Sequence, residues 1–206
     1  MASAPKKTVL ASEQERPDVA AARKVWRQRQ PAFDPARLVF IDETWAKTNM
    51  ARSRGWCRRG TRLIGRIPQG HWTTTTFVAG LRLDGITAPF VIDRPMNGLI
   101  FRTYVEQVLA PTLQTDDIVV MDNLGSHKGE EVRKLIEARG ALRLFLPPYS
   151  PDLNPIELAF AKLKALLRQA EARSVEDLWI RIGELLDAFT PQECQNYFNH
   201  AGYASI

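Results

Sequence analysis

Three acidic side chains, far apart along the chain, stand where they could share one site for a divalent cation. Asp42 directly follows the apolar run Leu38–Ile41, and Asp122 directly follows the apolar run Ile118–Met121. Runs that are apolar on both faces are typical of central, covered strands. In open α/β sheets, ligands bind beyond the carboxyl ends of such strands. If the two strands are neighbours, about 4.8 Å apart, both carboxylates lie at the same level of the sheet.

Two carboxylates at that separation repel each other and need a proton or a cation between them. With oxygen atoms as the only ligands, the natural cation is Mg²⁺ or Mn²⁺. The alternative, for either aspartate taken alone, is that it ends a strand and begins a turn. A third carboxylate at a suitable place favours the metal site over the two separate turns.

Glu157 is the candidate for the third carboxylate. Asn154 is a good helix N-cap, Pro155 suits the first helical position, and Glu157 falls at the third. Asn154 and Glu157 therefore also resemble a capping box, which is a purely structural alternative. Glu157 lies about 100° from the apolar stripe of the expected helix. From there its carboxylate can reach a site at the edge of the sheet, so a capping role and a role in that site are compatible.

The segments around these residues must form the scaffold that positions them. A meander of antiparallel strands followed by strand–helix units predicts a mixed sheet with helices on its faces. The ribonuclease H-like fold is built in this order, and we predict a mixed five-stranded sheet flanked by helices. We expect strands at 38–41, 73–83, 86–92, 118–121 and 142–146, and helices at 18–29, 98–109, 129–139, 155–173, 174–188 and 191–200.

The positive charge is concentrated in the first third of the chain. The net charge is +5, residues 1–37 hold eight Lys and Arg against four Asp and Glu, and residues 47–66 hold seven and no acidic residue. Segment 47–70 is expected to form a loop or hairpin. Its basic and aromatic side chains resemble a DNA-backbone contact surface with a stacking ring, the alternative being a solvated hairpin. The candidate DNA contacts there are Arg52, Arg54, Trp56, Arg58 and Arg59.

Other features of the sequence narrow the class of protein. Cys57 and Cys194 have neither metal-ligand spacing nor a disulfide framework around them. No apolar run reaches the roughly 18 residues that a membrane span needs, and the N-terminus lacks the apolar core of a secretory signal. A cytoplasmic protein is therefore expected. A nucleotide-binding Rossmann enzyme is unfavoured because neither glycine-rich phosphate motif follows a strand.

Three sequence blocks resemble the bacterial insertion-sequence transposases of the mariner-like superfamily. The blocks are Phe40–Thr44 (FIDET), Val120–His127 (VMDNLGSH) and Leu146–Glu157 (LPPYSPDLNPIE), and the similarity spans roughly residues 6–203. Thirty-four residues separate Asp122 from Glu157, which is the spacing typical of that group. The resemblance implies a ribonuclease H-like DDE catalytic domain at 38–206, preceded by a basic arm or linker at 1–37.

The resemblance also implies the chemistry. Asp42, Asp122 and Glu157 occupy the family's three acidic positions and are expected to be both catalytic and metal-binding, with two Mg²⁺ or Mn²⁺ ions as cofactors. In the family's pattern Asp42 bridges both ions, and Asp122 and Glu157 each hold one. The expected reaction is cleavage of phosphodiester bonds at transposon ends, followed by strand transfer into target DNA.

The expected partners follow from the same resemblance. They are double-stranded DNA, a second copy of the chain on that DNA, and a helix-turn-helix region that is separately encoded or fused by frameshifting, because we expect this chain to begin after that region. The enzyme is expected to be nucleoid-associated.

Two further residues of the second motif are candidates for the site. We expect Asn123, directly after Asp122, to orient that aspartate or to bind DNA, and His127 to contact a phosphate or to cap local structure.

Two other functions remain open from the sequence. One is a nuclease of the same fold that only hydrolyses nucleic acid. The other is a non-catalytic DNA-binding remnant of a transposase, which the presence of all three acidic residues disfavours. Glu43, the neighbour of Asp42, is expected to point to the opposite face if its strand continues.

Overall fold

A mixed five-stranded sheet forms the centre of the protein. The computed structural model describes residues 11–52, 54–68 and 70–203. The strand order is β3-β2-β1-β4-β5, with β1 antiparallel to β2, β2 antiparallel to β3, and β1, β4 and β5 parallel. This confirms the predicted sheet. The strands are β1 (Leu38–Lys47), β2 (Thr74–Arg82), β3 (Gly85–Ile92), β4 (Ile118–Met121) and β5 (Leu142–Phe145).

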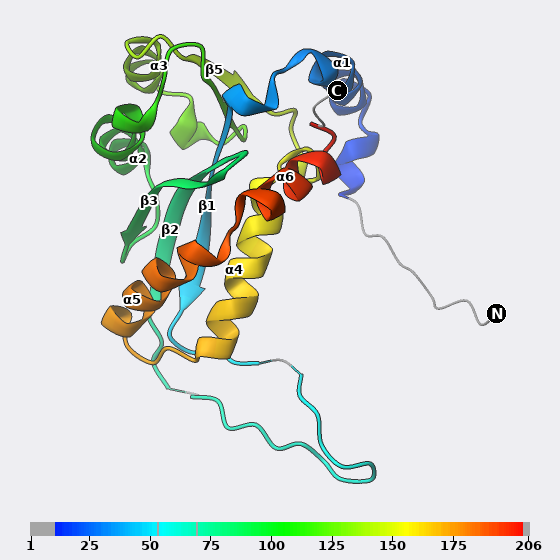
Figure 1. Ribbon diagram of the computed structural model, residues 1–206, viewed down its shortest axis with the longest axis vertical. Coiled ribbons are helices and arrows are strands. Elements are labelled where there is room, and N and C mark those ends of the chain that lie inside the picture. The colour runs from blue at the N-terminus through cyan, green and yellow to red at the C-terminus, as the bar shows by residue number, and fades with distance from the viewer. Residues whose placement is uncertain (1–10, 53, 69, 204–206) are drawn as a thin grey trace, which may run out of the picture.

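Helices cover both faces of this sheet. The residues of α2 and α3 pack into one core, and those of α4, α5 and α6 pack into the other. Figure 1 shows α2 beside α3, and α6 crossing near α4. A π-helical turn over Val105–Leu109 prolongs α2 to the residue where we expected that helix to end. No helix among the described residues combines the length and the apolar character needed to cross a membrane. The helices are α1 (Pro17–Arg29), α2 (Gly98–Tyr104), α3 (Glu130–Glu137), α4 (Ile156–Ala170), α5 (Val175–Leu185) and α6 (Pro191–His200).

Alternate residues of β1 pack into two separate cores. Leu38 and Phe40 belong to the core under α4 and α6, whereas Val39 and Ile41 belong to the core under α2 and α3. The ring of Phe40 lies 5.4 Å from that of Phe198 in α6, edge to face. Because side chains alternate along a strand, the next residue after Ile41 points to the α4 side.

β1 is longer than the sequence predicts. The expected strand 38–41 is wrong at its carboxyl end, because β2 pairs with β1 as far as Lys47 opposite Thr74. β4 pairs with β1 only over Leu38–Ile41. Asp42 therefore lies inside β1, but at the level where the neighbouring strand stops, so its side chain still borders an open edge.

α4 is shorter than the expected helix 155–173. It ends at Ala170, where Glu171 adopts a left-handed conformation with φ of 53°. Such a residue terminates the helical hydrogen-bond pattern. The turn that follows carries Arg173, whose Nη1 donates to the carbonyl oxygen of Met50 at 2.8 Å.

The segment between β1 and β2 leaves the body of the protein. Its described residues, within 48–73, form neither helix nor strand, so the loop predicted there is found without a paired hairpin. Figure 1 shows this segment, the β1–β2 loop, reaching far beyond the end of α4. Trp56 on it is fully exposed.

α1 packs against the C-terminal part of the chain. The indole Nε1 of Trp26 donates to the Tyr203 hydroxyl at 2.9 Å, and Gln30 Nε2 donates to the Ala201 carbonyl oxygen at 2.6 Å. Trp26 is also part of the core that contains Phe40. The division of the chain at residue 37 stays a prediction, but α1 shares the packed core of the residues that follow it. Residues 1–10 of the predicted arm lie outside the described residues.

Phe40→Ala should destabilise the protein by about 3–5 kcal/mol, because it removes a fully buried ring between β1 and α6. Denaturant unfolding followed by circular dichroism measures the change. Trp56→Ala is the control and should change the free energy of unfolding by no more than about 0.5 kcal/mol. Equal effects of the two substitutions would contradict the assignment of the core.

Candidate active site

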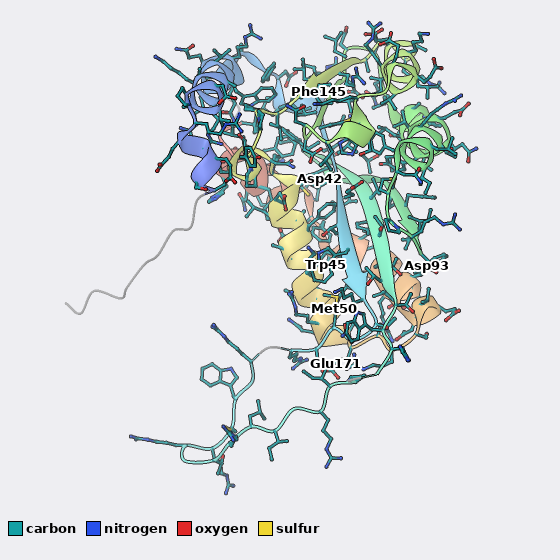
Figure 2. The ribbon with its side chains drawn as sticks, turned by 180° about the vertical axis from the view of Figure 1, so that it is seen from behind. Asp42, Trp45, Met50, Asp93, Phe145 and Glu171 are labelled. Atoms are coloured by element: carbon teal, nitrogen blue, oxygen red, sulfur yellow. The ribbon has the colours of Figure 1, made fainter. Side chains whose placement is uncertain are left out.

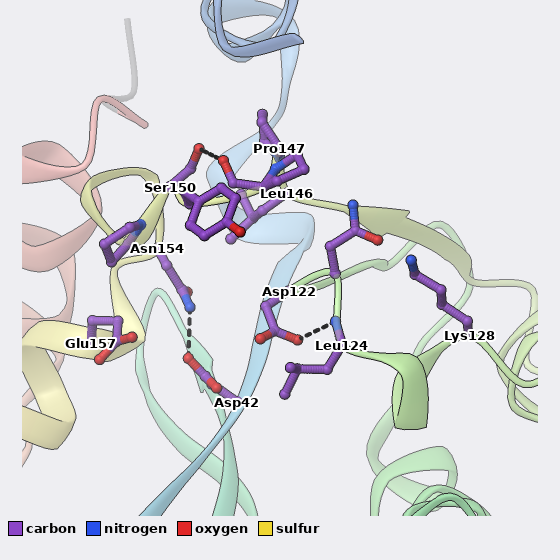
Figure 3. Close-up of a pocket in the computed structure, with 13 residues that line it drawn as sticks. Asp42, Asp122, Leu124, Lys128, Leu146, Pro147, Ser150, Asn154 and Glu157 are labelled. Carbon is purple, nitrogen blue, oxygen red and sulfur yellow. Dashed lines mark hydrogen bonds between the residues drawn. The ribbon is translucent and has the colours of Figure 1, made fainter. Parts of the chain in front are cut away.

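Asp42, Asp122 and Glu157 line one cavity of about 530 Å³. The parallel pairing of Leu38–Ile41 with Ile118–Met121 brings the two aspartates to the same level of the sheet. The third carboxylate comes from the first turn of α4, which packs on the same face of β1 as Phe40. Figure 3 shows the three carboxylates around this cavity. Residues up to 115 positions apart in sequence are thus brought together.

The Asp42 carboxylate is held by a hydrogen bond to each oxygen. Its Oδ1 accepts from the backbone N–H of Glu43 at 2.7 Å, and its Oδ2 accepts from Nδ2 of Asn154 at 2.8 Å. Asp42 is only 8% exposed. These contacts fix the orientation of the carboxylate before any ligand arrives.

Asn154 has a different role from the one that its position suggested. The capping-box interpretation is wrong, because Pro155 stands at the N-cap and no side chain caps α4. The Asn154 amide instead reaches across to Asp42, and its Oδ1 is buried without a hydrogen-bond partner. This role of Asn154 was not predicted from the sequence. The available signal was a polar side chain three residues before Glu157, in a loop bounded by prolines.

The Asp122 carboxylate contacts a backbone amide and the ring of His127. Its Oδ1 accepts from the N–H of Leu124 at 3.1 Å, and His127 Nδ1 lies 2.7 Å from the same oxygen, although not in hydrogen-bonding geometry. His127 Nε2 lies 3.9 Å from Oε2 of Glu43, on the face opposite Asp42, as expected for Glu43. Burial lowers the pKa of His127, but the contacts with both carboxylates outweigh it and raise the value to about 9.

The expected phosphate contact of His127 is wrong. Its side chain is fully buried and packs 4.2 Å from the ring of Phe101, measured between centroids. A group in this position acts on Asp122 and has no access to DNA. By contrast, Asn123 lines the cavity and is available to a ligand there, as is Lys128, whose place at the cavity the sequence did not indicate.

The remaining predicted DNA contacts lie elsewhere. Arg52, Arg54, Trp56, Arg58 and Arg59 belong to the β1–β2 loop and do not line the carboxylate cavity. Figure 2 shows the loop leaving the body of the protein beyond Met50, away from Asp42. Their role in DNA binding stays a prediction.

The negative charges of the site are only partly compensated. Burial, reinforced by the charges of Glu157 and Asp122, raises the pKa of Asp42 to about 7. Burial also raises the pKa of Glu157; Lys164 opposes this shift and Asp122 adds to it. A cation placed among these groups would relieve the repulsion and restore ordinary ionisation.

The residue types fit a divalent cation, although the side chains are not yet gathered around one. All the donors are oxygens, as Mg²⁺ and Mn²⁺ prefer, and the buried Asn154 Oδ1 still lacks a partner. Within the described part of the chain, no three His, Cys, Asp or Glu side chains are arranged to hold a metal ion as they stand. Asp42 is fixed by two hydrogen bonds, whereas Glu157, on the first turn of α4, is the more exposed of the two although it still borders the cavity. Ligation by all three therefore requires these side chains to move closer together.

In the metal-free protein the Asp42 carboxyl should titrate near pH 7, and Glu157→Gln should lower that midpoint by removing a neighbouring charge. The folded protein binds the Asp42 proton more tightly than the unfolded chain does, because its pKa is raised above the ordinary 3.8. Protonated Asp42 therefore makes its full contribution to folding stability below about pH 4, and this contribution is lost as the pH rises to about 7. Carboxyl ¹³C chemical shifts followed by NMR measure both midpoints. A wild-type midpoint below about 5 would contradict this electrostatic description.

Solved structures share this fold. The Mos1 strand transfer complex is 19% identical, with a TM-score of 0.71, over 98% of this chain and 62% of that one. The mariner Mos1 paired end complex with Mg is 18% identical, with a TM-score of 0.73, over 98% and 65% of the two chains. The Mos1 mariner transposase catalytic domain alone is 17% identical, with a TM-score of 0.65, over 94% of this chain and 89% of that one. The chain thus spans somewhat less than two thirds of the Mos1 chains in those complexes.

The family is shown by the sequence itself. No curated protein matches the sequence. The sequence model of the DDE superfamily endonuclease family matches residues 37–179, which is more than half of the chain. The matched part runs from the start of β1 into α5 and includes Asp42, Asp122 and Glu157. This chain therefore belongs to the DDE superfamily of endonucleases.

Proposed function

We propose that this chain is the catalytic domain of a DNA transposase of the bacterial insertion-sequence branch of the mariner-like superfamily. It cleaves phosphodiester bonds at transposon ends and joins them to target DNA. The observation that carries this proposal is the convergence of Asp42, Asp122 and Glu157 on one cavity in a chain of the DDE superfamily. The likeness to Mos1 strand transfer and paired end complexes supports it.

Asp42, Asp122 and Glu157 are the proposed catalytic residues, and they hold two Mg²⁺ or Mn²⁺ ions. Mos1 structures have been solved with Mn and with Mg, which supports this choice of metal. When bound, such ions activate an attacking water or DNA 3′-hydroxyl and stabilise the leaving oxygen. The protein needs no nucleophilic side chain of its own for this reaction.

The other residues of the site orient the carboxylates and receive the DNA. Asn154 and the Glu43 N–H keep the Asp42 carboxylate in one orientation, so that little reorganisation is needed when the substrate binds. The Leu124 N–H and His127 do the same for Asp122. The ammonium group of Lys128 at the cavity attracts the DNA phosphates.

The proposed partners are double-stranded DNA, a second copy of the chain and a helix-turn-helix region. The positive charge and exposed ring of the β1–β2 loop support a DNA contact there. A DNA substrate of this kind predicts a cytoplasmic, nucleoid-associated enzyme. In this proposal the loop binds the DNA backbone, whereas the carboxylate cavity binds the phosphate that reacts.

Asp42→Asn, Asp122→Asn and Glu157→Gln should each abolish metal-dependent nicking of DNA, because each removes one negative oxygen donor while keeping the size of the side chain. The assay measures nicking of a duplex carrying the element's terminal sequence, with Mg²⁺ or Mn²⁺. Circular dichroism checks that the variants remain folded. Glu106→Gln, an exposed substitution in the π-helical turn, is the matched control and should leave nicking unchanged.

Retained nicking in a folded variant would reject the assignment of that residue. A wild-type chain that binds DNA but never nicks it would favour the non-catalytic remnant. A strand-transfer assay with a 3′-hydroxyl-ended donor separates a transposase from a nuclease, because only the transposase joins the donor to the target.

Arg58→Ala combined with Arg59→Ala should weaken DNA binding and reduce the slope of log affinity against log salt by about 2, since each lost phosphate contact removes about 0.9. Fluorescence anisotropy over a range of salt concentrations measures the slope. The control is the pair Arg133→Ala, within α3, and Arg139→Ala, just after α3, far from the β1–β2 loop (Figure 1); it should leave the slope unchanged. Equal slopes for the loop variant and the wild type would exclude these arginines as phosphate contacts.

A further inference from the structure

A buried arginine of α1 forms hydrogen bonds with the loop that leads into α4. Arg23 is 8% exposed. Its Nη1 donates to Ser150 Oγ at 2.7 Å and to Asp152 Oδ1 at 2.8 Å, and its Nη2 donates to Asp152 Oδ2 at 2.7 Å. Arg23 and Asp152 thus form a two-pronged contact between segments 129 residues apart.

The segment that Arg23 contacts includes the turn directly before Asn154. Residues Pro151–Leu153 form a single 3-10 turn, and the Asn154 N–H donates back to the Pro151 carbonyl oxygen at 3.1 Å. Leu153 is buried, and its carbonyl oxygen accepts from the Tyr203 hydroxyl at 2.9 Å. The turn is therefore held from two sides, and the next residue is the one whose amide binds Asp42.

The same turn also sets the start of α4. The N–H of Glu157 donates to the Asn154 carbonyl oxygen at 3.2 Å, so the third carboxylate follows the position of Asn154. A continuous series of contacts therefore leads from Arg23 through Asp152 to Asn154, and from Asn154 to both Asp42 and Glu157.

Packing alone does not explain an arginine at this place. A buried guanidinium loses hydration, and well-packed apolar residues often stabilise a protein as much as a buried ion pair does. What the planar guanidinium adds is fixed geometry, because its parallel N–H groups match both oxygens of one carboxylate. The hydrogen bonds from Arg23 lower the pKa of Asp152 against the opposing effect of burial, so the carboxylate stays ionised at neutral pH.

We propose that Arg23 is a positioning residue of the active site, which acts through Asp152 and Ser150 on the turn that places Asn154 and Glu157. This inference rests on the proposed function. It makes α1, which lies outside the family match at residues 37–179, a necessary part of the catalytic unit. Arg23 itself does not line the carboxylate cavity, so its effect on the reaction is indirect.

A positioning role and a purely structural role predict different kinetics. A displacement of catalytic groups by about 1 Å can lower a rate about a hundredfold without weakening substrate binding. Loss of Arg23 should therefore lower kcat and leave KM for DNA nearly unchanged. A purely structural role would lower activity only in proportion to the unfolded fraction.

The test compares wild type with Arg23→Met, Arg23→Lys and Asp152→Asn. Arg16→Met is the matched control, because Arg16 forms a similar two-pronged contact with Asp18 on the exposed surface. For each protein, kcat and KM for DNA nicking are measured with Mn²⁺, Mn²⁺ binding is measured by calorimetry without DNA, and thermal melts give the folded fraction.

Arg23→Met and Asp152→Asn should lower kcat by about tenfold to a hundredfold, with KM within about twofold of wild type. Both variants should also bind Mn²⁺ more weakly than wild type. For Arg23→Lys, kcat and Mn²⁺ affinity should lie between those of these variants and of wild type, because a single ammonium group cannot bind both oxygens of the Asp152 carboxylate as the guanidinium does. Arg16→Met should match wild type in every measurement.

Wild-type kcat and Mn²⁺ affinity in folded Arg23→Met would overturn the inference, as would a loss of kcat that only follows the unfolded fraction. If Arg23→Met does not fold, Asp152→Asn and Arg23→Lys are judged by the same criteria. If wild type itself does not nick DNA, the proposed function fails, whereas the Mn²⁺ calorimetry still tests the positioning role by itself.

Discussion

Mutual repulsion of negative charge at one edge of the sheet is the constraint on which the site depends. Parallel pairing of β1 and β4 brings Asp42 and Asp122 to the same level, and α4 adds Glu157. The arrangement would be unfavourable if it served only the fold, because burial and its two neighbours raise the pKa of Asp42 to about 7. The surrounding structure holds the groups together despite this cost, as is common at functional sites.

Restraint of the carboxylates is shared between neighbouring and distant parts of the chain. Backbone amides close in sequence bind Asp42 and Asp122, and these contacts follow from the local turn. Asn154 reaches Asp42 from 112 residues away. His127 adds support to Asp122 from within the opposite core. Glu157 is the most exposed of the three carboxylates and stands on the first turn of α4.

The central features of the fold were predictable because they depend on local patterns. Apolar runs of four residues identified the two inner strands, and an aspartate after each run identified the edge where ligands bind. The end of β1 was not predictable, because it depends on pairing with β2: Glu43 pairs with Val78, 35 positions away, and Lys47 pairs with Thr74, 27 positions away. A period-two pattern of burial continues through Thr44 and Ala46, but the buried Thr44 is polar and the exposed Trp45 is apolar, so hydrophobicity along the sequence does not show the pattern.

The site was predictable in its carboxylates and not in their supports. Asn154 has the chemistry of a helix cap, and only the tertiary structure shows that its amide faces Asp42. Arg23 lies among several basic residues of α1, and nothing in the sequence distinguishes it from its exposed neighbours. His127 was recognised as part of the second motif, yet its burial depends on packing against Phe101 in α2.

The most direct test of the account is to locate the bound cation. Crystals grown with Mn²⁺ give anomalous difference density that identifies each manganese position without reference to activity. We expect peaks in the cavity that Asp42, Asp122 and Glu157 line, within ligating distance of these three carboxylates. Manganese found only outside this cavity, at a concentration that supports nicking, would contradict it.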